Sequence, residues 1–349
     1  MAKSGSTWLA VVIGISIAAT LPAWLTNQYF LHVLIVVCVF SVGALGVRLM
    51  LLAGHSNFGQ AGFMAIGAYS SDILASKLVG MPVWGSMLVG GLVAATFGAL
   101  IGFPALRVRG IYFSILTLAM GSAVRELILL NPFGLTGAPR QFSLGIAPPE
   151  PINLIVWRLD FSTKSGAYLL ALAMLLIALA VMHRLDSSRV GLLVRSLSQN
   201  EILAQSLGVH AVALKVVAFC ISCFLAGIAG AFYTHYLLYA DADLLGLWTS
   251  VYLVIYVVLG GTRYVFGPLV GSFCLVVLVE LLRDLPFLPD NKASAIEAVA
   301  YAILLIGMIF LAPRGLLSIV ETVRTNLAIS RPKPLTVGPE LEASQEAIK

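Results

Sequence analysis

Long apolar runs separated by short polar stretches dominate this chain. A helix that crosses a bilayer needs about 20 mostly apolar residues. By that measure the pattern predicts about ten spanning helices, at residues 8–25, 29–53, 61–77, 83–104, 111–130, 166–182, 213–236, 247–260, 265–283 and 295–312. We therefore expect an all-α, polytopic membrane protein whose membrane domain covers residues 1–312.

Composition supports this class. Of the 349 residues, 60% are hydrophobic and 11% are charged, whereas soluble domains have about 45–50% apolar and about 25% charged residues. The net charge of +5 does not indicate nucleic acid, because such binding needs lysines and arginines clustered on one face. Here they are spread between the apolar runs, so the partner we expect is the lipid bilayer.

The distribution of cations predicts the topology. Cytoplasmic loops carry an excess of lysine and arginine. With the N-terminus inside, 14 of the 21 lysines and arginines lie on the inner side, which places both termini in the cytoplasm. Residues 131–165 then form an outer loop and residues 183–215 the main cytoplasmic loop, and we expect the polar tail, 313–349, to be disordered.

Two glycine-rich stretches share an outline, "LAGHSNFGQAGF" at 52–63 and "LGGTRYVFGPLVGSF" at 259–273. Small residues let membrane helices approach closely, so tight packing is one interpretation. The other is a pair of discontinuous segments that line a substrate pathway, as transporters use near the bilayer midplane. The pathway candidates are Ser56, Asn57, Phe58, Gly59, Gln60, Thr262, Phe266 and Gly267.

The main cytoplasmic loop has an amphipathic, helix-like pattern. Apolar residues recur at helical spacing, and Gly208 is a plausible helix stop; the apolar positions are Val190, Leu193, Val194, Leu197, Ile202, Leu203 and Leu207. The pattern suits either an ordinary connector or a helix whose apolar face fills a groove in a cytoplasmic partner.

Ionisable residues inside membrane spans are costly and are functional candidates by default. Such residues here are Asp72, Arg125, Glu126 and Glu280. Most lie toward helix ends, where long side chains reach water and neighbours neutralise one another, so we favour a structural role. Arg48, near the inner end of its helix, fits a positive-inside anchor.

Catalytic signatures are missing from the sequence. It contains no G-x-x-x-x-G-K-[ST] phosphate-binding loop, no nucleophile elbow and no His, Cys, Asp or Glu cluster at metal-ligand spacing. We expect no catalytic, cofactor or metal site. If transport is driven by ATP, another polypeptide binds the nucleotide.

Five stretches together resemble the permease subunits of bacterial ATP-binding-cassette (ABC) importers for branched-chain amino acids, and most closely the longer of that system's two permeases. They are "GHSNFGQAGFMAIGAY" (54–69), "FPALRVRGIYFSILTLAMG" (103–121), residues 188–236, "VVLGGTRYVFGPLVGS" (257–272) and "APRGLL" (312–317). Asn57 stands where the family usually has serine, and "LTGAPRQF" (135–142) replaces a usual Leu-Thr-Gly-Gly-x-Asn-Gly run.

The resemblance implies an importer subunit in the bacterial inner membrane. Its partners would be a second related permease, two cytoplasmic ATP-binding subunits and an extracytoplasmic substrate-binding protein. The resemblance also implies that an ATPase docks on the main cytoplasmic loop. The positions that match the family's pattern there are Arg189, Gly191, Arg195, Asn200, Glu201, Ala204, Leu207, Gly208 and Lys215.

Two alternatives remain open on sequence grounds. Importers of urea or short amides share these motifs, and the cargo could be of that kind. A transporter driven by an ion gradient would instead need paired carboxylates deep in the helices, where this chain carries almost no charge.

Overall fold

The fold was analysed in a computed structural model. The structure describes residues 27–78, 80–108, 110–131, 163–243, 245–283 and 315–318, with isolated positions at 20, 22, 134, 136, 146, 152–153, 158–159, 299, 302 and 307. Apart from these isolated positions, the predicted spans at 8–25 and 295–312 lie outside the described residues, as do most of the outer loop and nearly all of the tail.

Helices make up almost all of the described chain. In order they are α2 (Gln28–Leu52), α3 (Gln60–Asp72), a π-helix η1 (Ile73–Leu78), α4 (Val83–Ala105), α5 (Ile111–Leu129), α6 (Lys164–Ser187), α7 (Arg189–Gln199), α8 (Glu201–Ser206), α9 (Ala211–Leu237), α10 (Leu247–Gly260) and α11 (Gly267–Arg283). Two-residue strands β1 (Ile152–Asn153) and β2 (Arg158–Leu159) pair antiparallel.

The predicted all-α membrane architecture is confirmed. Helices α2, α4, α5, α6 and α9 are long and apolar enough to cross a membrane, while α10 and α11 are apolar but shorter. The predicted span at 61–77 consists of the short helix α3 followed by the π-helix. The amphipathic loop is also helical, because α7 and α8 occupy most of residues 188–208.

Polar side chains fix where several helices begin. The side chains of Asn27, Thr163, Ser188 and Asn200 each accept a hydrogen bond from a backbone amide in the first turn of α2, α6, α7 and α8. Such caps satisfy donors that have no partner within the helix. Asn200 therefore ends α7 and begins α8, which separates two short helices in the cytoplasmic loop.

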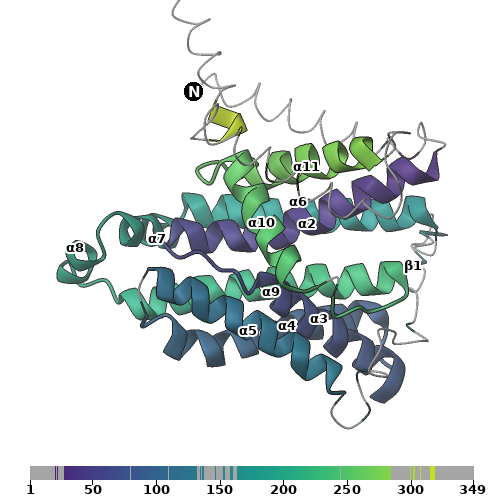
Figure 1. Cartoon of the computed structure of the whole chain (residues 1–349), viewed down its shortest axis with the longest axis horizontal. Helices are drawn as coiled ribbons and strands as arrows, with labels where there is room; N and C mark the ends of the chain where they lie inside the picture. Colours follow the sequence, from purple (N-terminus) through teal and green to yellow (C-terminus); the bar gives the residue numbers. More distant parts are fainter. Residues whose placement is uncertain are drawn as a thin grey trace, which may run out of the picture.

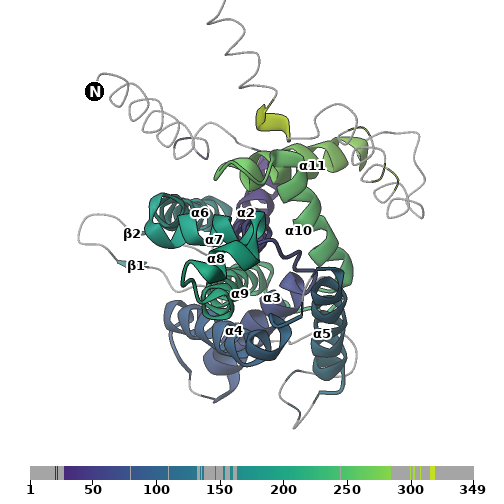
Figure 2. The same cartoon turned by 90° about the vertical axis from the view of Figure 1, so that its left-hand side faces the viewer.

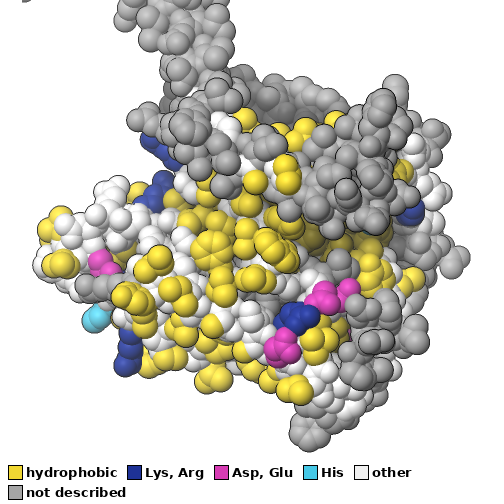
Figure 3. All heavy atoms as spheres, in the orientation of Figure 1, with side chains coloured by type: hydrophobic (Ala, Val, Ile, Leu, Met, Phe, Trp, Pro, Cys, Tyr) yellow, Lys and Arg dark blue, Asp and Glu magenta, His cyan; other side chains and the backbone are white. Residues whose placement is uncertain are grey.

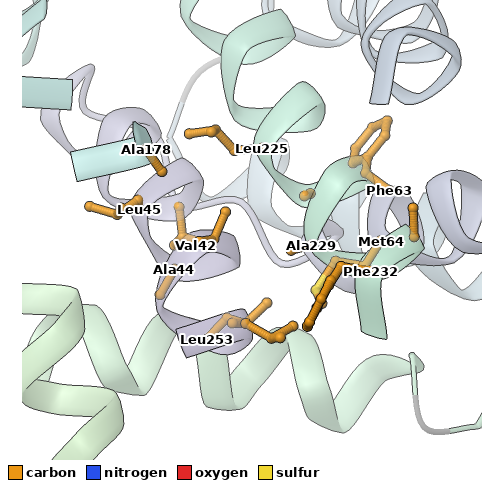
Figure 4. Close-up of a cluster of buried hydrophobic side chains, with 14 of the residues drawn as sticks. Val42, Ala44, Leu45, Phe63, Met64, Ala178, Leu225, Ala229, Phe232 and Leu253 are labelled. Atoms are coloured by element: carbon orange, nitrogen blue, oxygen red, sulfur yellow. The ribbon is translucent and has the colours of Figure 1, made fainter. Parts of the chain in front are cut away.

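Helices α2 and α9 lie at the centre of the bundle and the other long helices pack around them (Figures 1 and 2). Figure 4 shows the core where α2, α3, α9 and α10 meet, with Val42, Met64, Phe232 and Leu253 among its buried side chains. In α2, 72% of the most apolar 18-residue stretch is buried inside the protein, whereas in α5 only 17% of the corresponding stretch is buried. Helix α5 therefore stands at the periphery, with apolar side chains facing outward.

Glycines bring α3, α4 and α9 into backbone contact. A Cβ atom on Gly67 would overlap the backbone of Gly227, and one on Gly90 would lie 2.7 Å from the carbonyl oxygen of Gly67. A Cβ on Gly227 would in turn lie 2.9 Å from the Cα of Gly91. Any larger residue here would force the helices apart, which is why small residues suit membrane helix interfaces.

Candidate functional site

The first glycine-rich segment, residues 53–59, joins α2 to α3 without helical structure. Its backbone bonds to neighbouring helices, since the amide of Phe58 donates to Thr117 Oγ1 at 3.2 Å and the carbonyl of Ser56 accepts from Ser114 Oγ at 3.0 Å. Backbone polar groups that are buried outside a helix need such partners. Helix α5, which carries Ser114 and Thr117, therefore supports this segment.

A buried network of amides holds the start of α3. Asn57 and Gln60 are both fully buried, and Asn57 Nδ2 donates to Gln60 Oε1 at 2.7 Å. Gln60 Nε2 donates to the carbonyls of Gly43 and Ser222 at 3.2 and 3.1 Å, and Ser222 Oγ donates to Gln60 Oε1 at 3.1 Å. One side chain thus ties together α2, α3 and α9.

The second segment, residues 261–266, joins α10 to α11. Gly261 has a positive φ of 101°, which favours glycine. Gly315, from the "APRGLL" stretch, packs on it so closely that a Cβ at Gly315 would lie 2.6 Å from the amide nitrogen of Gly261. Two of the sequence stretches that carry the resemblance therefore meet here.

Arg48 connects α2 to the second segment. Its Nε donates to the carbonyl of Thr262 at 2.9 Å and its Nη2 to the carbonyl of Arg263 at 3.2 Å. Nη2 also pairs with Asp186 at the end of α6, at 2.6 Å. Arg48 is fully buried, so its interpretation as an anchor at the membrane surface is wrong. Its carboxylate partner lies 138 residues away, and a one-dimensional pattern of charges does not reveal such pairs.

The other intramembrane charges are paired or bonded. Arg125 forms ion pairs with Asp243 and Glu126, Asp72 accepts a hydrogen bond from Ser76 at 3.0 Å, and Glu280 accepts one from the hydroxyl of Tyr29. The side chains of Lys77 and Arg283, expected as neighbours of Asp72 and Glu280, lie outside the described residues. Opposite charges therefore neutralise Arg125 and Glu126 locally, whereas a structural role for Asp72 and Glu280 stays a prediction.

The segment expected to be the main cytoplasmic loop folds into a small unit at one end of the bundle, where α7 and α8 project beyond the long helices (Figures 1 and 2). Leu197, Ala204 and Ala211 form its core. The expected docking residues differ in exposure: Gly191, Ala204 and Lys215 are buried, Arg195 and Glu201 are half-buried, and Arg189, Asn200, Leu207 and Gly208 are exposed. Glu201 accepts from Lys215 Nζ at 2.8 Å, and Arg195 pairs with Asp186 at 3.1 Å.

Four large apolar side chains of this unit are exposed. Leu192, Ile202, Leu203 and Leu207 are 61%, 70%, 58% and 78% exposed. Exposed apolar side chains in number on one small unit are typical of interaction sites. Because a polar chain segment carries them at one end of the bundle, the unit presents a surface suited to another protein.

The pathway candidates form two groups in the structure. Ser56, Asn57, Phe58, Gly59 and Gln60 lie together beside α5 and α9. Thr262, Phe266 and Gly267 lie at the turn between α10 and α11. Within these groups Asn57, Gly59, Gln60 and Gly267 are buried, Ser56, Phe58 and Thr262 are half-buried, and Phe266 is 48% exposed. Their role in a pathway stays a prediction, and Gly59 and Gly267 each have close backbone neighbours.

These features define a multi-pass membrane protein that combines glycine-packed helices with a small helical unit at one end of the bundle. Residues 29–312 match the model of a protein family described as the permease component of branched-chain amino acid transport systems. The chain belongs to this family of ABC importer permeases.

Three relatives illustrate the likeness. The high-affinity branched-chain amino acid transport system permease protein LivM of Salmonella typhimurium is 32% identical over 70% of this chain and 62% of the relative. LivM of Escherichia coli is 30% identical over 81% of this chain and 71% of the relative. The probable branched-chain amino acid transport permease protein LivH of Methanocaldococcus jannaschii is 26% identical over 68% of this chain and 75% of the relative.

The matched region therefore spans between three fifths and three quarters of these relatives. No solved structure matches the chain.

Proposed function

We propose that this chain forms half of the translocation pathway of an ABC importer for branched-chain amino acids, and that separate cytoplasmic subunits bind and hydrolyse the ATP. The family membership and the names of the LivM relatives support the cargo. The same names do not favour a urea or amide importer, and they speak against a transporter driven by an ion gradient.

The exposed apolar side chains of α7 and α8 are the observation that carries the mechanism. Burial of apolar surface contributes about 25 cal/mol per Å² to association, and helices commonly dock by laying such a face into a groove. Leu192, Ile202 and Leu207 are available for this contact. Helix α7 also abuts α6, so a partner bound here can move the membrane helices.

The full assembly would contain a second related permease, two ATP-binding subunits and an extracytoplasmic binding protein, in a bacterial inner membrane. Both termini would be cytoplasmic, which the distribution of lysine and arginine supports. Hydrophobic side chains cover the middle of the face over α5 and α10 (Figure 3), as expected for a surface that contacts lipid or the second permease.

The pathway would use the two glycine-rich segments. Ser56, Phe58, Thr262 and Phe266 are the candidates with surface available to a passing molecule. Asn57 and Gln60 are bonded inside the protein, so they would shape the pathway from behind. Phe266→Ala should then change the rate of uptake without changing assembly, as measured by transport of labelled leucine.

The docking proposal is tested by co-purification of tagged ATPase subunits with the permease, followed by uptake in proteoliposomes. Ile202→Ser with Leu207→Ser should lower ATPase recovery at least tenfold and abolish leucine uptake. Leu130→Ser, at a residue 80% exposed beyond the end of α5, is the matched control and should bind normally. Undiminished ATPase recovery by the double variant would refute docking at α7 and α8.

Cargo is tested in the same vesicles. Isoleucine and valine should compete with labelled leucine when the binding protein is present, and urea should not. Uptake that depends on a proton or sodium gradient, and continues without ATP, would contradict the importer assignment.

A further inference from the structure

A buried ion cluster lies where α2, α6 and α7 meet. The carboxylate of Asp186 on α6 pairs with Nη2 of Arg48 on α2 at 2.6 Å and with Nη2 of Arg195 on α7 at 3.1 Å. The side chain of Asp186 is 8% exposed and that of Arg48 is fully buried. The bond between Arg48 and Asp186 is buried, and charged hydrogen bonds in dry surroundings are strong and geometrically specific; the Arg195 side chain is 39% exposed. One carboxylate therefore links the cytoplasmic helical unit to a membrane helix.

Arg48 also contacts the second glycine-rich segment, residues 261–266. Its guanidinium donates to the backbone carbonyls of Thr262 and Arg263, and a guanidinium presents its donors in a rigid plane. A shift of Arg48 must therefore move these two carbonyls or break the bonds to them. Backbone acceptors also mean that the contact does not depend on the side chains at 262 and 263.

Helix α7 is attached to Asp186 by more than the ion pair. Gly191 on α7 packs on the end of α6 so tightly that a Cβ there would overlap the carbonyl of Leu185 and lie 2.9 Å from the Cα of Asp186. Ser188 Oγ donates to the carbonyl of Leu185 at 2.7 Å. A displacement of α7 is therefore passed to the Asp186 carboxylate, because no side chain between the two backbones can absorb it.

We propose that Arg48 is a positioning residue that transmits movement of α7, through Asp186, to the segment 261–266. We call this connection the relay. When ATPase subunits move α7, the Asp186 carboxylate moves with it, and Arg48 carries the carbonyls of Thr262 and Arg263 to a new position. The inference rests on the proposed function, because it needs a partner that acts on α7. It assigns to Arg48 the role of connecting the helix on which the ATPase docks, α7, to the proposed pathway segment 261–266.

The experiment uses the complete importer in proteoliposomes, with the native cysteines replaced and Arg263→Cys as an exposed reporter. Arg263→Cys changes only the side chain, so the backbone carbonyl of residue 263 that accepts from Arg48 is retained. Three quantities are measured: ATPase recovery, leucine transported per ATP hydrolysed, and the change in thiol labelling at position 263 when ATP and vanadate are added. Arg48→Met and Asp186→Asn are the test variants. Ser41→Ala is the control, since it removes a buried 2.6 Å bond between α2 and Ser272 on α11 without touching the relay.

Both test variants should assemble with the ATPases and hydrolyse ATP, but transport at least fivefold less leucine per ATP and lose the labelling change. Ser41→Ala should retain both. Asp186→Asn is decisive if Arg48→Met inserts poorly, because it leaves Arg48 and its bonds to the carbonyls of Thr262 and Arg263 in place and removes the carboxylate that joins Arg48 to Arg195. A normal transport ratio and labelling change in Asp186→Asn would overturn the relay.

The proposed function fails separately from the relay. If the unmodified chain does not recover ATPases, or transports leucine without them, the importer assignment is wrong. If it does both as expected while Asp186→Asn behaves like the unmodified chain, only the relay is wrong.

Discussion

The side-chain amide of Asn57 donates a hydrogen bond to Gln60 Oε1 at 2.7 Å, and both residues are inaccessible to solvent. In a membrane protein this pair has no water to replace a lost partner. The glycine-rich segment before α3 thus depends on polar bonds as well as on close packing, and it forms a fixed part of the bundle around α9.

Gln60→Leu should destabilise the protein markedly. It removes the donors to the carbonyls of Gly43 and Ser222 and the acceptor used by Asn57. An orphaned buried polar group costs about 1–3 kcal/mol. Chemical unfolding in detergent micelles should show a loss of that size. Thr96→Ala, which removes only an exposed bond within α4, should leave the midpoint unchanged, and equal midpoints for the two variants would contradict the network's role.

Glu201→Gln should destabilise more than Lys215→Met. The Lys215 side chain is 1% exposed and the Glu201 side chain is 21% exposed, so losing the carboxylate leaves a buried ammonium while losing the ammonium leaves a carboxylate that water can reach. Removing one partner of an ion pair so that the other charge stays buried and unpaired costs about 3–5 kcal/mol of stability. A double-mutant cycle by unfolding in micelles checks this, and the double variant should be more stable than Glu201→Gln. Additive losses would show that the pair is not coupled.

Gly191→Ala should weaken ATPase binding. The added methyl group would overlap the carbonyl of Leu185, and overpacking of this kind costs about 1–3 kcal/mol. Helix α7 would tilt away from α6 and misplace the docking face, which co-purification should report as a loss of several fold. Gly208→Ala is the comparison: its φ of 86° is unfavourable for alanine, but open space surrounds it. Stronger impairment in Gly208→Ala would count against the packing argument.

Acid should destabilise the protein through His55. This residue lies in the 53–59 segment, outside the helices that flank it, and burial lowers the pKa of its imidazole below the ordinary value of 6.5. As pH falls below about 6.5, the unfolded chain binds a proton that the folded chain does not, so the free energy of unfolding decreases. Unfolding between pH 7.5 and 5 should therefore show a smaller loss in His55→Gln than in the unmodified chain. Parallel pH profiles would disprove the assignment.

Much of the fold could be predicted because a long run of apolar residues in the sequence is enough to locate a membrane helix. The predicted spans at 29–53, 83–104, 111–130 and 247–260 lie within two residues of helices α2, α4, α5 and α10. The π-helix at Ile73–Leu78 could not be foreseen, since apolar residues there suit either helix type. The helical nature of the cytoplasmic unit followed from the spacing of Val190, Val194 and Leu197.

The site was predicted less completely, for a physical reason. Glycine pairs such as Gly67 and Gly227, or Gly261 and Gly315, meet only after folding, and composition cannot tell which glycines face each other. The same holds for Arg48, whose position near a helix end suggested an interfacial anchor until Asp186 and the two carbonyls accounted for it. Asn200 was expected at a docking surface, and the structure adds a cap for α8.

The glycine contacts among α3, α4 and α9 also limit how this protein can move. Because the backbones of these helices touch at the glycines, no side chain at the crossing can change its rotamer to let one helix slide along another. These three helices should turn only as a single block. Opening and closing must then take place at the borders of this block, for example at the turn between α10 and α11, which Arg48 on α2 holds by two hydrogen bonds.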